Sequence, residues 1–203
     1  AYVADGLLQP GEEAPAHQPQ LLPGQVKLKN INGDDKLNEE DMVLIGRNDP
    51  KFIFGFNNNF SYKNFDLNIY MYGQVGKIAG ANSYYDAWGS YGNRIKLGQN
   101  VPVSFKDAWS SDNQTSTRPS FIESAYGTGD LFLQKISFLR IRNITLGYTV
   151  PISKSICNRL RVYADINNPC VWTNWKGQDP ETDSNTNAYP NVTSFSIGVD
   201  ISF

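Results

Sequence analysis

The clearest pattern in the chain is the strict alternation of its last ten residues. Every second residue there is apolar: Phe195, Ile197, Val199, Ile201 and Phe203. The residues between them are small or polar: Ser194, Ser196, Gly198, Asp200 and Ser202. Successive side chains of a β-strand point to opposite faces, so the stretch predicts a strand with one apolar and one polar face. The apolar face would meet a second sheet in a soluble sandwich, or lipid in an outer-membrane barrel.

The same alternation predicts four more strands upstream, separated by turn signals and long polar segments. We expect strands at 51–62, 64–75, 136–150 and 159–171, followed by the closing strand at 192–203. The turn signal Tyr62-Lys63-Asn64 predicts that the first two form a hairpin. Strands of about 10 to 12 residues exceed the five or six residues usual in soluble sheets. They match the length that crosses a bilayer at a tilt.

One predicted strand changes its alternation partway along. In 136–150 the apolar residues from Ile144 onward occupy even positions, whereas upstream the even positions hold Arg140 and Arg142. Such a change predicts a β-bulge, or a strand that continues beyond the lipid zone.

The connections between the predicted strands alternate in length. The turns at 62–64 and 151–158 are short, whereas 76–135 and 172–191 are long. Outer-membrane barrels combine short periplasmic turns with long extracellular loops in this order, and soluble domains rarely contain so long an irregular segment. Residues 1–50 also predict an extracellular loop, because prolines interrupt much of it. Five strands are too few to close a barrel, so further strands must come from elsewhere.

Composition narrows the classes of function. The net charge of −2 on 203 residues gives no indication of nucleic-acid binding. No apolar run is long enough for a transmembrane helix, which does not exclude a membrane barrel. The two cysteines, Cys157 and Cys170, would lie near opposite ends of one strand, too far apart for a disulfide, so we expect free thiols.

Residues 30–41 have the spacing of a twelve-residue calcium loop, with substitutions. The predicted oxygen ligands are Asn30, Asn32, Asp34, the Lys36 carbonyl, Asn38 and Asp41. Asn stands at position one, and Asp35 stands at position six, where glycine normally supplies a positive φ. With only two charged ligands, we expect weak calcium binding or a polar turn without the ion.

No pattern in the chain predicts an enzyme. His17, the only histidine, lies in a proline-rich segment and is expected to be solvated. Asp179 and Glu181 could form a glycosidase pair, but they flank Pro180 in a loop, where solvated charges are far commoner. The tryptophans of the loops are candidates for contacts with a ligand or a lid protein, or for packing among the loops: Trp88, Trp109, Trp172 and Trp175.

Several segments together resemble the C-terminal region of the SusC/RagA family of TonB-dependent outer-membrane transporters. They are residues 30–41, Ile45-Gly46, Pro50, Gly55, 62–67, 137–148 and 176–181. The series extends from about Asp5-Gly6 to the terminal Phe203. Asn30 and Asp35 depart from the Asp and Gly usual in the family, which puts calcium in doubt.

The resemblance implies a whole protein with a barrel of about 22 strands, closed by an N-terminal plug, in the bacterial outer membrane. It implies import of glycans or peptides, driven by TonB through the N-terminal part missing here, with a SusD-like surface lipoprotein as a lid. This chain would supply about five C-terminal antiparallel strands at 51–203 and the extracellular loops 76–135 and 172–191. Its partners would then be the remaining barrel and plug, the lipoprotein, the substrate and membrane lipid. The terminal Phe203 fits the aromatic ending by which such barrels are recognised for assembly.

Two alternatives from other classes remain. The first is a secreted β-sandwich that binds carbohydrate with calcium, and the second is a glycosidase. Solubility without detergent would favour the sandwich, and turnover of glycans would favour the enzyme.

Overall fold

The computed structural model describes residues 1–80, 97–98, 100, 103–121, 125–152, 157–177, 179–182 and 189–203. It divides into two compact units. The first combines Ala1–Gly46 with Gly80–Gln134, and the second combines Arg47–Ala79 with Lys135–Phe203. The expected boundary near residue 50 separates 1–46 from the strands, but it does not anticipate that 80–134 would join the first unit.

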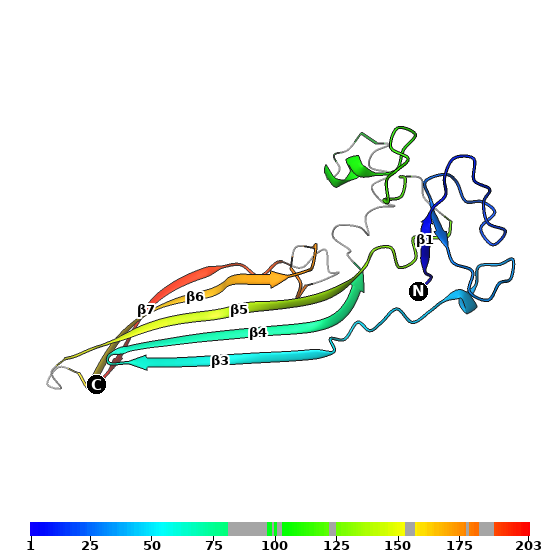
Figure 1. Ribbon diagram of the computed structural model, residues 1–203. Coiled ribbons are helices and arrows are strands. Elements are labelled where there is room, and N and C mark those ends of the chain that lie inside the picture. The colour runs from blue at the N-terminus through cyan, green and yellow to red at the C-terminus, as the bar shows by residue number, and fades with distance from the viewer. Residues whose placement is uncertain are drawn as a thin grey trace. The chain divides into compact units, whose positions relative to one another are not determined.

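The second unit is a five-stranded antiparallel sheet with strand order β3-β4-β5-β6-β7 (Figure 1). Its strands are β3 (Phe52–Tyr62), β4 (Phe65–Gly80), β5 (Leu133–Val150), β6 (Arg159–Thr173) and β7 (Ser194–Ser202). The all-β prediction is therefore confirmed. β4 and β5 extend beyond the expected 64–75 and 136–150, at the ends that face the long connection.

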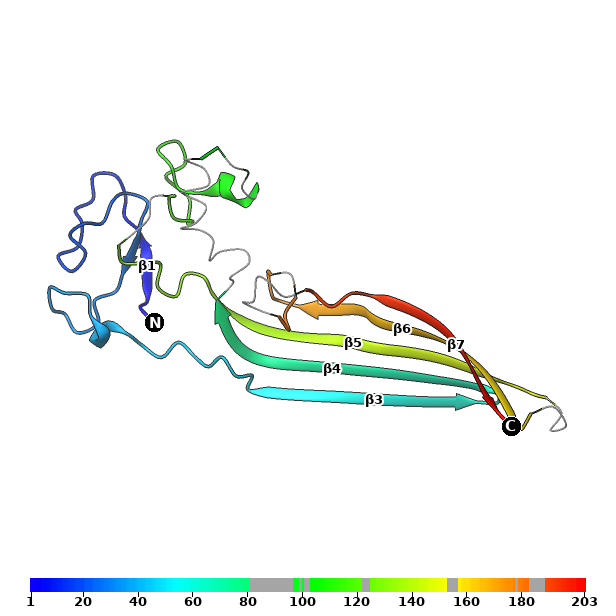
Figure 2. The ribbon, with the colours of Figure 1, turned by 180° about the vertical axis from the view of Figure 1, so that it is seen from behind.

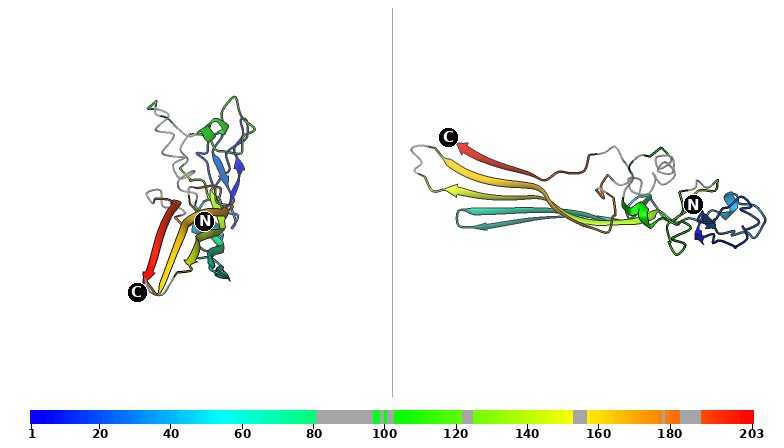
Figure 3. Two further views of the ribbon diagram at one scale, coloured as in Figure 1. Left: turned by 90° about the vertical axis from the view of Figure 1, so that its left-hand side faces the viewer. Right: turned by 90° about the horizontal axis from the view of Figure 1, so that it is seen from above.

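Neighbouring strands of this sheet follow one another in sequence, and the sheet has two outer edges. Within the described residues, β3 pairs with β4 alone and β7 with β6 alone. Seen from behind, the C-terminus lies at the same end of the sheet as the β3–β4 turn (Figure 2). The strands curve along their length, as twisted sheets do (Figure 3).

The predicted hairpin turn is one of two places where a residue other than glycine has a positive φ in the described chain. Tyr62 pairs with Phe65, and Lys63 between them has a φ of 52°. A two-residue hairpin turn needs such left-handed backbone to match the twist of its strands. The second place is Asn168, with a φ of 49° in β6.

Asn168 lies where the pairing of β5 with β6 becomes irregular. Ile141 pairs with Cys170, but Asn143 pairs with Asn167, so β6 contains one extra residue. The irregularity falls at the change of alternation between Arg142 and Ile144, as the sequence predicts for a bulge.

The first unit has its own small core, although residues 1–50 were expected to be loop. β1 (Ala4–Leu7) pairs antiparallel with β2 (Val26–Leu28). Leu7, Val26 and Leu28 are buried, and Trp109 and Tyr126 pack against them. The short helices η1 (Glu39–Asp41) and η3 (Val103–Asp107) belong to this unit.

Two polar side chains hold the proline-rich segment against β2. The buried Gln18 accepts a 2.7 Å hydrogen bond from the Leu28 amide through its Oε1. His17 Nε2 lies 2.8 Å from the Leu28 carbonyl oxygen and is half-buried, so its expected full solvation is wrong.

Cys157 and Cys170 are both free thiols, which confirms the prediction. No helical segment in the described ranges has the length and apolar character needed to span a membrane.

Candidate functional site

The sheet of the second unit has one continuous apolar face. The register places Phe56 opposite Met71, and places Leu146, Ala164 and Ile197 side by side on β5, β6 and β7. The five apolar residues of the closing segment belong to this face by their alternation and are between 52% and 89% exposed: Phe195, Ile197, Val199, Ile201 and Phe203. Side chains of this size are rarely left in water as one contiguous surface, so the face requires an apolar partner.

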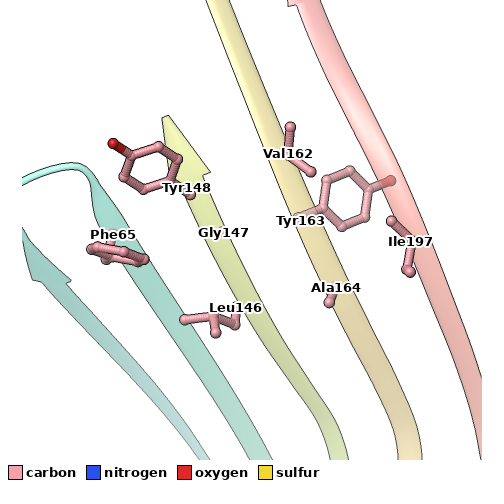
Figure 4. A pocket seen from close by; sticks show the side chains of 8 residues that line it. All are labelled: Phe65, Leu146, Gly147, Tyr148, Val162, Tyr163, Ala164 and Ile197. Atoms are coloured by element: carbon pink, nitrogen blue, oxygen red, sulfur yellow. The ribbon is translucent and has the colours of Figure 1, made fainter. Parts of the chain in front are cut away.

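A shallow groove of about 310 Å³ marks this apolar face near the β3–β4 turn. Leu146, Val162 and Ile197 line it around the smaller Ala164, and the Phe65 and Tyr148 rings lie at one side (Figure 4). Those two ring centroids are 4.7 Å apart. The groove arises because Ala164 is shorter than its neighbours, and its lining is almost wholly apolar.

The opposite face of the sheet is polar, and its side chains bond to one another across strands. On β3 and β4, Asn68 Nδ2 donates to Asn57 Oδ1 at 2.7 Å and to Asn59 Oδ1 at 2.6 Å. On β5 and β6, Asp165 accepts from Thr145 Oγ1 at 2.6 Å and from Asn167 Nδ2 at 2.7 Å. A face of this chemistry suits water or polar protein rather than lipid.

Arg161 links three strands across this polar face. Its Nε and Nη2 donate to the two oxygens of Asp66 at 2.9 and 2.6 Å, and its Nη1 donates to Asp200 Oδ2 at 3.0 Å. Asp66 lies on β4 and Arg161 on β6, so the pair crosses β5 over Gly147. A Cβ on Gly147 would lie 2.5 Å from Asp66 Oδ1 and 2.4 Å from Arg161 Nη2. The glycine therefore leaves the space through which the ion pair forms.

A second arginine cluster joins β5 to the loop between β6 and β7. We call it the loop anchor, made of Arg140, Arg142, Asp179, Glu181 and Asn191. Arg140 Nη2 donates to Asp179 Oδ1 at 2.7 Å, and Arg140 Nε lies 2.8 Å from Glu181 Oε2. Arg142 Nη2 donates to Glu181 Oε1 at 2.8 Å. Asn191 donates from its backbone to Asp179 Oδ2 and from its side chain to Glu181 Oε2.

The loop anchor is deeply buried at its centre. The side chains of Arg140 and Asp179 are only 3% and 4% exposed, and Pro180 is fully buried. Burial alone would raise the pKa of Asp179. The backbone N–H groups of Glu181 and Asn191, together with Arg140, outweigh it and lower that pKa. Asp179 and Glu181 are thus paired and structural, which corrects the expectation of solvated loop charges.

Arg142 lies on β5 where its pairing with β6 is irregular. Arg142 lies over the Tyr72 ring, 5.9 Å from its centroid. Tyr72 alternates with Tyr70 and Asn68 on the polar face of β4. Ile144, two residues beyond Arg142, pairs with Ile166 on the apolar face. The changed alternation at Arg140 and Arg142 was visible in the sequence, but nothing there indicated their partners 39 residues away.

The four candidate tryptophans have different surroundings. Trp172 is 54% exposed at the loop end of β6, whereas Trp175 is 6% exposed. Trp109 packs in the core of the first unit with its ring against Gly24, where an added Cβ would lie 2.3 Å from the indole. Trp88 lies outside the described residues. Among these side chains, Trp172 presents a ring that a ligand could reach.

The side chains of the loop at 30–41 do not fit a calcium site, because several of them present N–H donors where calcium needs oxygen acceptors. Its centre is the Asp34 carboxylate, which accepts hydrogen bonds from the side-chain amides of Asn32 and Asn38. Asp41 uses its oxygens on backbone amides. The positive φ occurs at Gly33, at 78°, and Asp35 has none. The described residues also contain no group of three or more His, Cys, Asp or Glu side chains placed to hold a metal.

The chain is similar to several curated TonB-dependent receptors. It is 28% identical over 201 residues to TonB-dependent receptor P3 of Formosa agariphila, covering 89% of this chain and 19% of the relative. It is 26% identical over 180 residues to TonB-dependent receptor SusC of Bacteroides thetaiotaomicron, covering 85% and 17%. The chain therefore spans about a fifth of the length of these relatives. No family model matches it.

The fold is similar to that of a solved peptide importer. The structure of the RagAB peptide importer in the "open-open" state matches all of this chain with a TM-score of 0.70 and 21% identity, over 22% of that chain. The structure of the RagAB peptide transporter matches with a TM-score of 0.68 and 22% identity. Over nearly its whole length, the chain is thus similar in sequence to TonB-dependent receptors that include SusC, and similar in fold to chains of RagAB.

Proposed function

We propose that this chain forms part of the wall and external loops of a TonB-dependent transporter in the bacterial outer membrane, which imports glycans or peptides with a SusD-like surface lipoprotein. The observation that carries the proposal is the two-faced sheet. Its long strands have an exposed apolar face on one side and a hydrogen-bonded polar face on the other. A transmembrane barrel needs this division between lipid and lumen in every strand.

The outer edges of the sheet support the same proposal. β3 and β7 each lack a second neighbour within the described residues. Unpaired backbone groups are costly in lipid, so membrane-spanning sheets are closed. The missing neighbours would be supplied by the rest of a barrel, and the relatives are long enough to contain one.

The alternative of a soluble carbohydrate-binding sandwich is less well supported. A sandwich buries the apolar face of one sheet against a second sheet. Here Phe195 and Ile197 are 75% and 84% exposed. The calcium that the alternative requires would have to bind in the loop at 30–41, whose donor atoms do not fit it.

Substrate and lipoprotein contacts are assigned to the external segments 76–135 and 172–191. Trp172 and Tyr189 are exposed rings in the described part of these segments, and aromatic rings can stack on sugars. The name of one structural neighbour supports the peptide class, because RagAB is described as a peptide importer.

The first experiment asks whether the purified protein depends on detergent. We expect it to fractionate with outer membranes, to need detergent for extraction and to co-purify with a full-size barrel and a surface lipoprotein. A soluble, folded monomer of 22.7 kDa would overturn the proposal.

The second experiment distinguishes the two faces of one strand. Nitroxide labels at Ile197→Cys and Ser196→Cys, in protein whose native cysteines are replaced by serine, form a matched pair. We expect dissolved oxygen to relax the label at 197 more strongly, and a water-soluble nickel chelate to relax the label at 196. Equal access of the chelate to both labels would contradict a transmembrane β7.

A further inference from the structure

The loop at 30–41 has the spacing of a calcium loop, but its charges are arranged in the opposite sense. A calcium site surrounds a cation with oxygen acceptors. Here the loop surrounds an anion, the Asp34 carboxylate, with N–H donors. Asn32 Nδ2 donates to Asp34 Oδ2 at 3.1 Å, and Asn38 Nδ2 donates to the same oxygen at 3.3 Å. The Lys36 backbone N–H donates to Asp34 Oδ1 at 2.8 Å.

The orientation of these asparagines follows from chemistry. An ionised carboxylate can only accept hydrogen bonds, so the amide groups that face Asp34 must present their NH₂ ends. Their oxygen atoms then serve the backbone: Asn32 Oδ1 accepts from the Asp34 N–H at 3.1 Å, and Asn38 Oδ1 accepts from the Glu40 N–H at 2.7 Å. Asn30 does the same, accepting from Gly33 N–H through Oδ1 and donating through Nδ2 to the Asp34 carbonyl. Aspartate at these positions could accept but not donate.

Both carboxylate oxygens of Asp41, the last residue of the loop, accept hydrogen bonds from backbone amides. In a calcium loop the twelfth residue grips the ion with both carboxylate oxygens. Asp41 is fully buried, and its Oδ1 accepts from the Ile31 N–H at 2.7 Å. Its Oδ2 accepts from the Asn38 N–H at 3.0 Å, and it completes a capping box at the start of η1. It therefore ties the beginning of the loop to its end.

We propose that asparagines at positions one, three and nine make this a metal-independent version of a calcium loop, in which Asp34 takes the central place of the ion. The loop follows β2 in the chain. The segment after the loop is attached to the chain's first residues, because the Val43 N–H donates to the Ala1 carbonyl at 2.9 Å. Its closure would then be insensitive to external calcium. The proposal concerns this loop alone and stands apart from the transport function.

Trypsin cleavage after Lys36 tests the proposal on the intact, detergent-solubilised protein, because cleavage requires local opening of the loop. We expect the same cleavage rate in millimolar calcium and in excess chelator. Calcium that slowed cleavage of the unaltered protein several-fold would overturn the proposal. This readout is local, so calcium bound elsewhere in a large barrel does not confuse it.

Two variants and one matched control make the test specific. Asp34→Asn should accelerate cleavage by about tenfold, with or without calcium, because it removes the charged acceptor of the network. The matched control, Asp35→Asn, changes the charge of the exposed neighbour equally and should leave the rate within about twofold.

Asn30→Asp combined with Asn38→Asp supplies acceptors without donors. In chelator, we expect trypsin to cleave this double variant after Lys36 faster than it cleaves the unaltered protein. We expect calcium to slow that cleavage. Calcium-independent cleavage at the unaltered rate in this variant would contradict the role given to the asparagine donors.

Discussion

The two arginine clusters of the sheet have similar partners but different surroundings. Arg161 and Arg140 each face two carboxylates on other segments. Arg161 and its partners Asp66 and Asp200 have side chains that are 15%, 36% and 59% exposed. Arg140 and its partners Asp179 and Glu181 are 3%, 4% and 17% exposed. Burial, rather than the number of ion pairs, therefore decides how much each cluster contributes to stability.

The physical reason is desolvation. Charges that keep contact with water lose little when a partner is removed, because water replaces it. A buried charge left without its partner has no such replacement. Removing one charged partner should therefore cost the loop anchor most of its stabilising free energy. Removing one partner from the Arg161 network should cost only a small part of it.

The largest effect is expected from Asp179→Ala, which leaves the buried Arg140 short of one carboxylate. We expect the attachment of the loop to β5 to weaken by about 3–5 kcal/mol. Trypsin cleavage after Lys176, near the loop's start, measures the resulting opening. The control Asp200→Ala removes one carboxylate from the other cluster, and it should leave cleavage at Lys176 unchanged. Equal rates in the two variants would contradict the comparison.

The loop anchor should also open in acid, because protonation of Asp179 removes its charge. Its pKa is lowered in the folded protein, so its stabilising contribution is complete above the ordinary aspartate pKa of about 4. The contribution is lost as pH falls from there through the lowered folded-state value. The spectrum of a nitroxide at Tyr189→Cys, with native cysteines replaced, should sharpen below about pH 4 and stay constant from there to neutrality. The same label with Asp179→Asn should show little of this acid transition, and a transition of full size there would assign it to another group.

A smaller effect is expected at Gly147, where a side chain would occupy the space of the Asp66–Arg161 pair. Gly147→Val should destabilise the folded protein by about 1–3 kcal/mol, as overpacking usually does. Thermal unfolding in detergent, followed by circular dichroism, measures the loss. Gly55→Ala is the control, because a Cβ there would lie 3.5 Å or more from its neighbours and should be tolerated.

The smallest effect is expected from Asp200→Asn, which removes the more exposed partner of Arg161 and leaves the bidentate bond to Asp66. We expect a loss of less than about 1 kcal/mol, reduced further by salt. The same unfolding assay measures it. A loss as large as that of Asp179→Ala would show that exposure does not distinguish the two clusters.

The sequence predicted the sheet well because alternation is a local signal. Phe52 to Tyr62 and Ser194 to Phe203 show period two without knowledge of their neighbours, and Lys63 marks the turn. The position of the irregular pairing also had a local signal, since Arg140 and Arg142 break the alternation of β5 opposite the extra residue of β6. By contrast, β1 and β2 have four and three residues, too few to show a period.

The clusters could not be predicted for the opposite reason. Arg161 and Asp66 are 95 residues apart in the sequence. Their ion pair can be predicted only once the order of the strands in the sheet is known. Asp179 and Glu181 looked solvated because proline and polar neighbours usually indicate an exposed loop. At the loop at 30–41, spacing suggested calcium, and only the direction of the asparagine amides showed that donors surround Asp34.

The outer edges of the sheet have a consequence for how the protein must be made. In the proposed membrane setting, the backbone groups of β3 and β7 can remain unpaired only while water reaches them. Insertion into lipid and the joining of both edges to neighbouring strands must then occur as one event. A chain that met either edge of another copy first would form a sheet with the wrong partner. Biogenesis, rather than the stability of the finished wall, is thus the stage at which this segment is most vulnerable.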